Sequence, residues 1–241
     1  MLTGICTAIA ALVSLTPALS ADRFERIPGK NIDFYGVHCG NDTDVEKAIP
    51  VLRDLGGRWV RLWCTVHWDE RTEHRSFQAA RDFKKAGFQV ILLLNHHGGD
   101  QPLPDYATVR RYCDWIQAVD GMRQAVDVWE ICNELNLPKY WPGAPQQYVE
   151  QVLKAAWDSF HARGELVLGG SFTAWQEGEY GVSVTAEFVD AGYNNYCDFA
   201  GFHPYTDRPR VMADVMHQAA DLFADKPIIV TEWNLKQTRD L

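Results

Sequence analysis

The stretch Val126-Asp127-Val128-Trp129-Glu130-Ile131-Cys132-Asn133-Glu134 decides the fold of this chain. It is a short apolar strand that ends directly on an Asn-Glu pair. Elsewhere the runs 90–94 and 228–230 are apolar at every position rather than at every second one. Such runs indicate strands buried on both faces, as in parallel sheets covered by helices. We therefore expect a parallel α/β fold with polar side chains at its strand ends.

Short apolar runs alternate with longer amphipathic stretches along the chain, the pattern of parallel strands joined by crossover helices. The seven predicted strands are 33–39, 59–66, 89–95, 126–132, 166–171, 198–203 and 227–232. The predicted helices are 44–55, 77–86, 106–120, 144–163, 185–191 and 208–224. Asp44 and Asp105 stand where they could cap two of these helices.

Polar and aromatic residues follow almost every predicted strand. They are His38, Trp63, His96, His97, Asn133, Glu134, Phe172, Thr173, His203, Tyr205, Glu232 and Trp233. A closed barrel gathers all strand ends around one mouth, whereas a doubly wound sheet shares a site only near its switch point. No glycine-rich phosphate fingerprint follows the first strand. The sequence therefore predicts a TIM-type (β/α) barrel.

The predicted barrel has seven recognised strands, and an eighth is not seen. Residue 241 lies only nine positions after Glu232, which leaves no length for another strand. We expect either a fragment or a barrel that is incomplete at its C-terminal end, whose open edge something else must cover. Because 241 residues suffice for one sizeable core but not for two, residues 22–241 are expected to form one domain and a monomer.

Residues 1–21 have the features of an export signal. An apolar run spans 5–15, and Pro17 and small residues up to Ala21 follow it. The run is too short to cross a bilayer, and no Lys or Arg precedes it. We therefore expect a secreted or periplasmic protein with no membrane span in the mature chain.

The composition excludes some classes of partner and cofactor. A net charge of -9, with no Lys/Arg cluster longer than two residues, argues against a nucleic-acid partner. Nine Trp residues suit sugar binding, because indole faces stack on the C–H faces of pyranose rings. The cysteines outside the signal are odd in number and lack paired metal-type spacing, so we expect no zinc, other metal or cofactor. Those beside apolar runs are expected to be small buried residues.

Two carboxylates, Glu134 and Glu232, each end an apolar strand. Cleavage of a glycosidic bond needs one carboxyl to protonate the departing oxygen and a second to attack or to activate water. Two strand-end carboxylates facing each other across a barrel mouth supply that arrangement. Glu130 lies on the same strand one layer deeper, where we expect a paired structural role.

At these residues the chain resembles the clan A glycoside hydrolases, with greatest likeness to families 5 and 39. In that clan an Asn-Glu pair ending the fourth strand carries the acid/base, matching Asn133 and Glu134. A Glu ending the seventh strand is the nucleophile, matching Glu232. Our strand count places both on those strands. The resemblance covers residues 33–234 and implies a retaining glycosidase.

The resemblance also implies roles for further residues. The clan's second-strand Arg matches Arg61, which would hold Glu232 ionised through a charge-assisted hydrogen bond. Asn133 would bind the sugar 2-hydroxyl, and His203 or Tyr205 would orient a carboxyl. The remaining predicted substrate-binding residues are His97, Trp141, Trp175 and Trp233. This aromatic set suits an oligosaccharide or polysaccharide and endo action.

Two other interpretations stay open. A metal-dependent (β/α) barrel sugar isomerase would use Glu134, His203, Glu232 and Asp207 as ligands. That interpretation explains the glutamates but not Asn133 or the aromatic loops. A truncated barrel could instead bind carbohydrate without turning it over.

Overall fold

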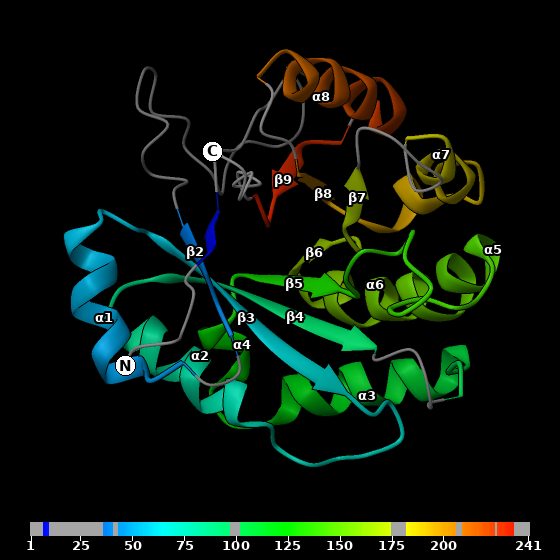
Figure 1. Ribbon diagram of the computed structural model, residues 1–241. Coiled ribbons are helices and arrows are strands. Elements are labelled where there is room, and N and C mark those ends of the chain that lie inside the picture. Colours follow the sequence, from blue (N-terminus) through cyan, green and yellow to red (C-terminus); the bar gives the residue numbers. More distant parts are fainter. Residues whose placement is uncertain are drawn as a thin grey trace.

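The structure is a computed structural model that describes residues 7–9, 36–40, 43–96, 102–174, 182–205, 209–224 and 226–233. Figure 1 shows its strands inside and its helices around the outside. The strands are β1 (Thr7–Ile9), β2 (Gly36–Cys39), β3 (Trp59–Val66), β4 (Gln89–His96), β5 (Val128–Ile131), β6 (Leu166–Leu168), β7 (Phe172–Ala174), β8 (Ala200–Pro204) and β9 (Ile228–Val230).

The helices follow the strands in alternation, as the sequence predicts. They are α1 (Val45–Asp54), α2 (Arg75–Lys85), α3 (Tyr106–Ala118), α4 (Met122–Ala125), α5 (Pro145–Gln147), α6 (Lys154–Phe160), α7 (Val182–Asp190) and α8 (Pro209–Phe223). A π-helical segment at Tyr148–Leu153 joins α5 to α6. The predicted caps are confirmed: Asp44 accepts a hydrogen bond from the Lys47 amide, and Asp105 accepts one from the Thr108 amide. Among the described residues, no helix combines the length and apolarity that crossing a membrane requires.

The strands form two sheets with the orders β1-β2-β3-β4-β5-β6 and β7-β8-β9. All neighbours are parallel except β1, which pairs antiparallel with β2. A single bridge between Leu168 and Phe199 links the two sheets. Strand β1 lies within the predicted export signal, so cleavage after Ala21 would remove it; the rest of residues 1–21 is outside the described residues.

The predicted strand 166–171 is wrong in its extent, because the structure splits it around Gly169 and Gly170. A Cβ atom on Gly169 would collide with the Tyr193 ring, and one on Gly170 would lie 2.5 Å from the Ile131 carbonyl oxygen. The backbone N–H groups of the two glycines donate to the Phe199 carbonyl and the Tyr148 hydroxyl. The chain therefore changes partners here, with β6 pairing to β5 and β7 to β8.

Replacement of Gly170 with Ala is expected to lower the free energy of unfolding by about 1–3 kcal/mol, the usual range for overpacking a filled site. The new methyl group would also meet the Leu135 side chain at 2.9 Å. Gly40→Ala is the matched control, because a Cβ there meets nothing within 4 Å. Urea unfolding of both variants checks the prediction. Equal unfolding midpoints for Gly170→Ala and Gly40→Ala would show that the Ile131 carbonyl does not crowd position 170.

The inside of the strand array is closed at one end by a small apolar cluster. Ile91, Val128, Leu168 and Phe199 are its buried members, and Trp59, Leu166 and Ile229 pack against it. Since side chains alternate along a strand, residues two positions further along β3 and β5 point to the same interior. Those residues are Arg61 and Glu130, so a charged layer lies directly above the apolar one. The larger core lies between the strands and helices and contains the five described cysteines outside the signal, all of them buried and none of them in a disulfide.

Candidate active site

Glu134 lies just after β5 in a backbone conformation that is rare for its residue type. Its φ is 36°, and that of Cys132 is 67°, both in the left-handed region. Each such non-glycine residue costs on the order of 1–3 kcal/mol and persists only where the surroundings impose it. Here the Cys132 amide donates to the Leu94 carbonyl, and the Leu135 amide donates to that of Ser171. The neighbouring elements thus fix the turn that presents Glu134, whose side chain is 7% exposed.

Arg61 on β3 is the centre of the charged layer. Its fully buried guanidinium forms two hydrogen bonds with Glu130, at 2.5 and 2.8 Å. The predicted structural pairing of Glu130 is therefore confirmed. Nη2 also donates to Asn133 Oδ1 at 2.8 Å, and Nη1 lies 3.2 Å from His38 Nδ1. One cation thus organises groups from β2 and from β5 and its C-terminal end.

Glu232 follows β9 and receives hydrogen bonds on both oxygens. Arg61 Nη1 donates to Oε1 at 2.5 Å, and the Tyr205 hydroxyl donates to Oε2 at 2.5 Å. Burial alone would raise the pKa of this carboxyl, but the electrostatic influence of His203, Arg61 and His38 and the hydrogen bond from Tyr205 outweigh it. The net pKa lies well below the usual range, so Glu232 is ionised at neutral pH.

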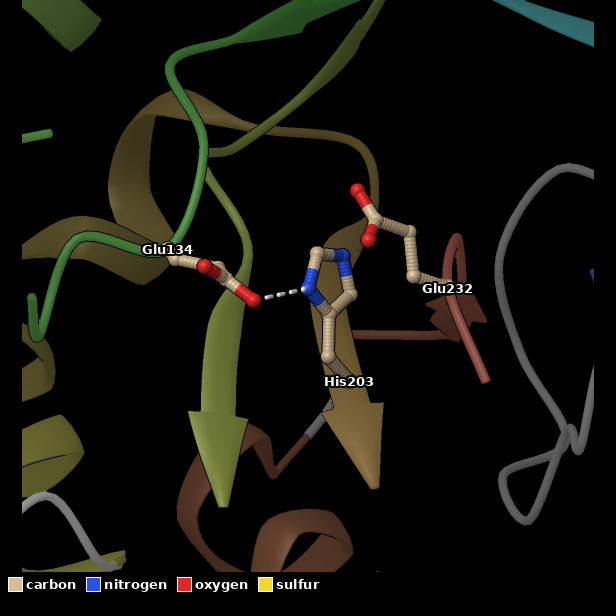
Figure 2. A group of neighbouring side chains, drawn as sticks. All are labelled: Glu134, His203 and Glu232. Atoms are coloured by element: carbon tan, nitrogen blue, oxygen red, sulfur yellow. Dashed lines mark hydrogen bonds and ion pairs between the residues drawn. The ribbon is translucent and has the colours of Figure 1, made fainter. Parts of the chain in front are cut away.

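His203, at the end of β8, stands between the two carboxyls in Figure 2. Its Nδ1 lies 3.1 Å from Glu134 Oε1, and its Nε2 lies 2.8 Å from the Thr231 hydroxyl. One ring nitrogen of His203 and one oxygen from each glutamate all lie within 4.8 Å of one another. The carboxyls that the sequence placed on separate strands therefore meet at one point.

Several neighbours of the glutamates were absent from the predicted set of site residues. His38 on β2 contacts Arg61, and burial and the nearby Arg61 charge lower the pKa of its imidazole to about 4, so the ring is neutral at neutral pH. Asn95 accepts a hydrogen bond from the Asn133 amide at 3.1 Å, and Thr231 contacts His203. A signal for them existed, because each lies at a strand end, but strand ends alone do not separate positioning residues from bystanders.

The structure moves one predicted sugar-binding residue into the core. Trp141 is only 2% exposed, its indole Nε1 donates to the Ala144 carbonyl, and its ring packs edge-on against His96 and Tyr148. Both neighbouring rings cover the indole in this structure. Trp233 is half-buried beside Glu232.

Another pair of aromatic side chains lies near the site, next to His38, which contacts Arg61. Trp63 on β3 packs edge-on against His38 and is 6.0 Å, centroid to centroid, from Tyr140, and both of these aromatic side chains are half-buried. His97, Trp175 and Asp207, which the sequence analysis also named, lie outside the described residues.

Comparison with known proteins adds a family and a fold. The family model described as glycosyl hydrolase catalytic core matches residues 110–240, a stretch that contains Glu134, His203 and Glu232. The predicted glycoside hydrolase resemblance is thereby confirmed. No curated protein sequence matches the chain.

Solved structures with the same fold include three carbohydrate-active enzymes. A glucosidase from Croceicoccus marinus has a TM-score of 0.61 at 17% identity, over 77% of this chain and 47% of its own. Xylanase 10B from Thermotoga maritima has 0.56 at 16%, over 85% and 71%. A mutant GH128 endo-beta-1,3-glucanase from Amycolatopsis mediterranei, in complex with laminaripentaose, has 0.50 at 15%, over 83% and 70%. These matches confirm the TIM-type α/β fold, and the chain spans about half the length of the glucosidase.

Proposed function

Because this chain belongs to the glycosyl hydrolase catalytic core family, whose model matches more than half of its residues, we propose that it is a retaining glycosidase. Its substrate is the O-glycosidic bond of an oligosaccharide or polysaccharide, cleaved by double displacement. Glu232 is the nucleophile and Glu134 is the acid/base.

The observation that carries this proposal is the closeness of the two carboxyls. Oxygens of Glu134 and Glu232 lie within 4.8 Å of each other. Retaining enzymes hold their carboxyl groups about 5–5.5 Å apart, whereas inverting enzymes need about 6.5–9.5 Å to fit a water molecule on the far side of the sugar. The short separation therefore supports direct attack by Glu232.

The electrostatics supports the same division of roles. In the first step the ionised Glu232 attacks the anomeric carbon while Glu134 gives its proton to the departing oxygen, so the glycosidic bond breaks as an ester bond forms. In the second step Glu134 takes a proton from water, and the resulting hydroxide displaces Glu232 from the sugar. Arg61 donates to Oδ1 of Asn133, which leaves the amide N–H₂ as the end that can donate to a sugar hydroxyl.

We also propose endo action on a chain of several sugars and export from the cytoplasm. The pair formed by Trp63 and Tyr140 lies next to His38, and half-buried Trp233 follows Glu232, so aromatic side chains that sugars could stack on lie near the charged layer. The apolar run 5–15 followed by small residues supports export.

The anomeric form of the first product tests the proposal. We expect hydrolysis of at least one substrate among aryl β-glucosides, aryl β-xylosides, laminarin and xylan, chosen because the solved structures of the same fold include a glucosidase, an endo-beta-1,3-glucanase and a xylanase. Proton NMR within the first minutes should show the product in the configuration of the substrate. An initial product of opposite configuration would contradict double displacement.

A metal site is the competing use of the same residues. Glu134, His203 and Glu232 are a donor set that could hold a cation. However, Arg61 already neutralises Glu232 at 2.5 Å and would repel a divalent ion at that oxygen. We therefore expect hydrolysis to be unchanged after dialysis against EDTA. Complete loss that Mg²⁺ or Mn²⁺ restores would instead show that these residues hold a metal ion, and metal-dependent isomerisation of a free sugar without any hydrolysis would select the isomerase interpretation.

A binding module that does not turn its ligand over is the third interpretation. It predicts that calorimetry detects oligosaccharide binding of equal affinity in the natural chain and in Glu232→Ala, with no product from either. Product formed by the natural chain and none by the variant would exclude it.

A further inference from the structure

A line of buried hydrogen bonds reaches Glu134 from behind, through hydroxyl groups that the mechanism above does not use. Ser171 Oγ donates to Glu130 Oε1 at 2.6 Å and lies 3.0 Å from Thr231 Oγ1. Thr231 Oγ1 in turn lies 2.8 Å from His203 Nε2, and His203 Nδ1 lies 3.1 Å from Glu134 Oε1. Ser171, Thr231 and His203 are all fully buried, so water does not interrupt the line.

The number of hydrogen atoms in this line fixes the direction of each bond. A hydroxyl group has one hydrogen to donate. Ser171 donates its hydrogen to Glu130, whose carboxylate is ion-paired with Arg61 and can only accept. The contact between Ser171 and Thr231 is therefore a hydrogen bond only if Thr231 is the donor. Thr231 Oγ1 also lies 3.5 Å from Glu130 Oε1, and this longer contact would likewise direct the Thr231 hydrogen away from His203.

His203 must then supply the hydrogen in its contact with Thr231. The ring carries a hydrogen on Nε2, and in the neutral imidazole Nδ1 is the acceptor. With Nδ1 as the acceptor, the contact with Glu134 is a hydrogen bond only when the Glu134 carboxyl is protonated and donates. The opposite tautomer would leave two oxygen lone pairs facing each other between Ser171 and Thr231, which costs one buried hydrogen bond.

We propose that Ser171 and Thr231 are positioning residues that hold His203 in the Nε2–H tautomer, so that Nδ1 accepts a hydrogen bond from the protonated carboxyl of Glu134 and keeps this acid/base protonated for the first step. This inference rests on the proposed role of Glu134 as the acid/base. A hydrogen bond to the protonated form of a carboxyl favours that form, whereas an Nδ1–H donor would favour the carboxylate. Two hydroxyl groups outside the reacting pair thereby set the charge that Glu134 carries.

The first test reads the tautomer directly, without any substrate. In ¹⁵N-labelled protein the two ring nitrogens of His203 give separate NMR shifts that distinguish Nδ1–H from Nε2–H, and the resonances are assigned by their loss in His203→Asn. We expect Nε2–H in the natural chain. Thr231→Val removes the hydroxyl with little change of shape, and Ser171→Ala removes the acceptor of the Thr231 hydrogen. Both should shift His203 toward Nδ1–H, while Thr231→Ser keeps the hydroxyl and should not.

The second test separates this role from a general structural one. Losing the protonated acid matters most when the leaving group is poor, so Thr231→Val should lower kcat/KM for an alkyl glycoside or laminarin about tenfold, the equivalent of one hydrogen bond. The rate with a dinitrophenyl glycoside should change less than twofold. The alkaline limb of the pH profile should move to lower pH, because the carboxylate form of Glu134 gains a donor.

The charged and titratable groups around Glu134 and His203 come from five strands or strand ends. They are His38, Arg61, Glu130, Tyr205 and Glu232. None of them is altered in these variants, so a shift of the pH profile reports the change at Thr231. Thermal unfolding of each variant shows that it is folded before rates are compared.

The outcomes are distinct from those that test the proposed function. An Nδ1–H tautomer or a doubly protonated ring in the natural chain at neutral pH would overturn the inference even if the chain is a glycosidase. So would a tautomer that is the same in Thr231→Val, Ser171→Ala and Thr231→Ser. Equal rate losses on both kinds of substrate would do the same. Absence of any hydrolysis by the natural chain would overturn the proposed function, while the tautomer would still be measured.

Discussion

Glu232→Gln is expected to lower kcat/KM on every substrate by at least about 10⁴-fold, because an amide cannot form the ester bond of the first step. The variant should fold normally, since the Gln oxygen can still accept the hydrogen bond from Arg61 that the carboxylate accepts at 2.5 Å. Steady-state kinetics with aryl glycosides, together with circular dichroism, measures the two effects separately.

Glu134→Gln is the matched comparison for this result. The variant lacks the acid, so cleavage of poor leaving groups should fall by about 10²–10⁴-fold, the usual contribution of general acid–base catalysis. Formation of the glycosyl-enzyme from a dinitrophenyl glycoside needs no proton and should survive, and azide should speed its breakdown. If both glutamine variants hydrolysed substrates as fast as the natural chain, Glu134 and Glu232 would not be catalytic. If the rate loss depended on the leaving group in Glu232→Gln and not in Glu134→Gln, the two glutamates would have the opposite roles.

The second large effect is on stability. Arg61→Met is expected to lower the free energy of unfolding by about 3–5 kcal/mol, because it leaves the carboxylate of Glu130 buried without its cation. Both side chains of that pair are 0% exposed, so solvent does not screen the loss. Chemical denaturation at neutral pH measures the change. The double variant Arg61→Met/Glu130→Leu removes both charges and should recover most of the stability, but no activity.

The same substitution changes how stability depends on pH. The folded-state pKa of Glu232 is depressed, so its ionised form contributes stability above the reference pKa of 4.5, and this contribution is lost as the pH falls through the folded value. Without Arg61 the depression of this pKa is smaller, so the loss of stability in acid should be complete at a higher pH, which urea unfolding across the acid range measures. An Arg61→Met variant within about 1 kcal/mol of the natural chain would show that the charged layer is not what holds the barrel interior.

The strand positions and the placement of Glu134 and Glu232 at strand ends were predictable from the sequence because each depends on local pattern. The predicted strand 59–66 coincides with β3, and uninterrupted apolar runs mark β4 and β9 as buried. The break between β6 and β7 was not predictable, because it follows from the space that Tyr193 and Ile131 occupy against two glycines. An isolated Gly-Gly pair indicates flexibility but not which distant side chain comes close.

The site shows the same division between local and non-local information. The resemblance to clan A implied that Arg61 binds Glu232, and the structure confirms this contact. Its second carboxylate, Glu130, was predicted to be paired, but the partner was not named. The hydroxyls of Ser171 and Thr231 gave no signal, since Ser and Thr at strand ends are common. The burial of Trp141 was not predictable either, because loop position does not reveal whether a ring turns inward.

Arg61 lies outside the segment that the family model matches. The family match begins at residue 110, so it includes both carboxyls of the proposed mechanism and the buried Glu130. Arg61, the cation that Glu130 and Glu232 share with Asn133, lies outside that match, 69 residues before Glu130 and 171 before Glu232. A fragment limited to residues 110–240 would therefore inherit the acids without their counter-charge. The segment that the family model matches is therefore shorter than the segment that holds these carboxylates together with their cation.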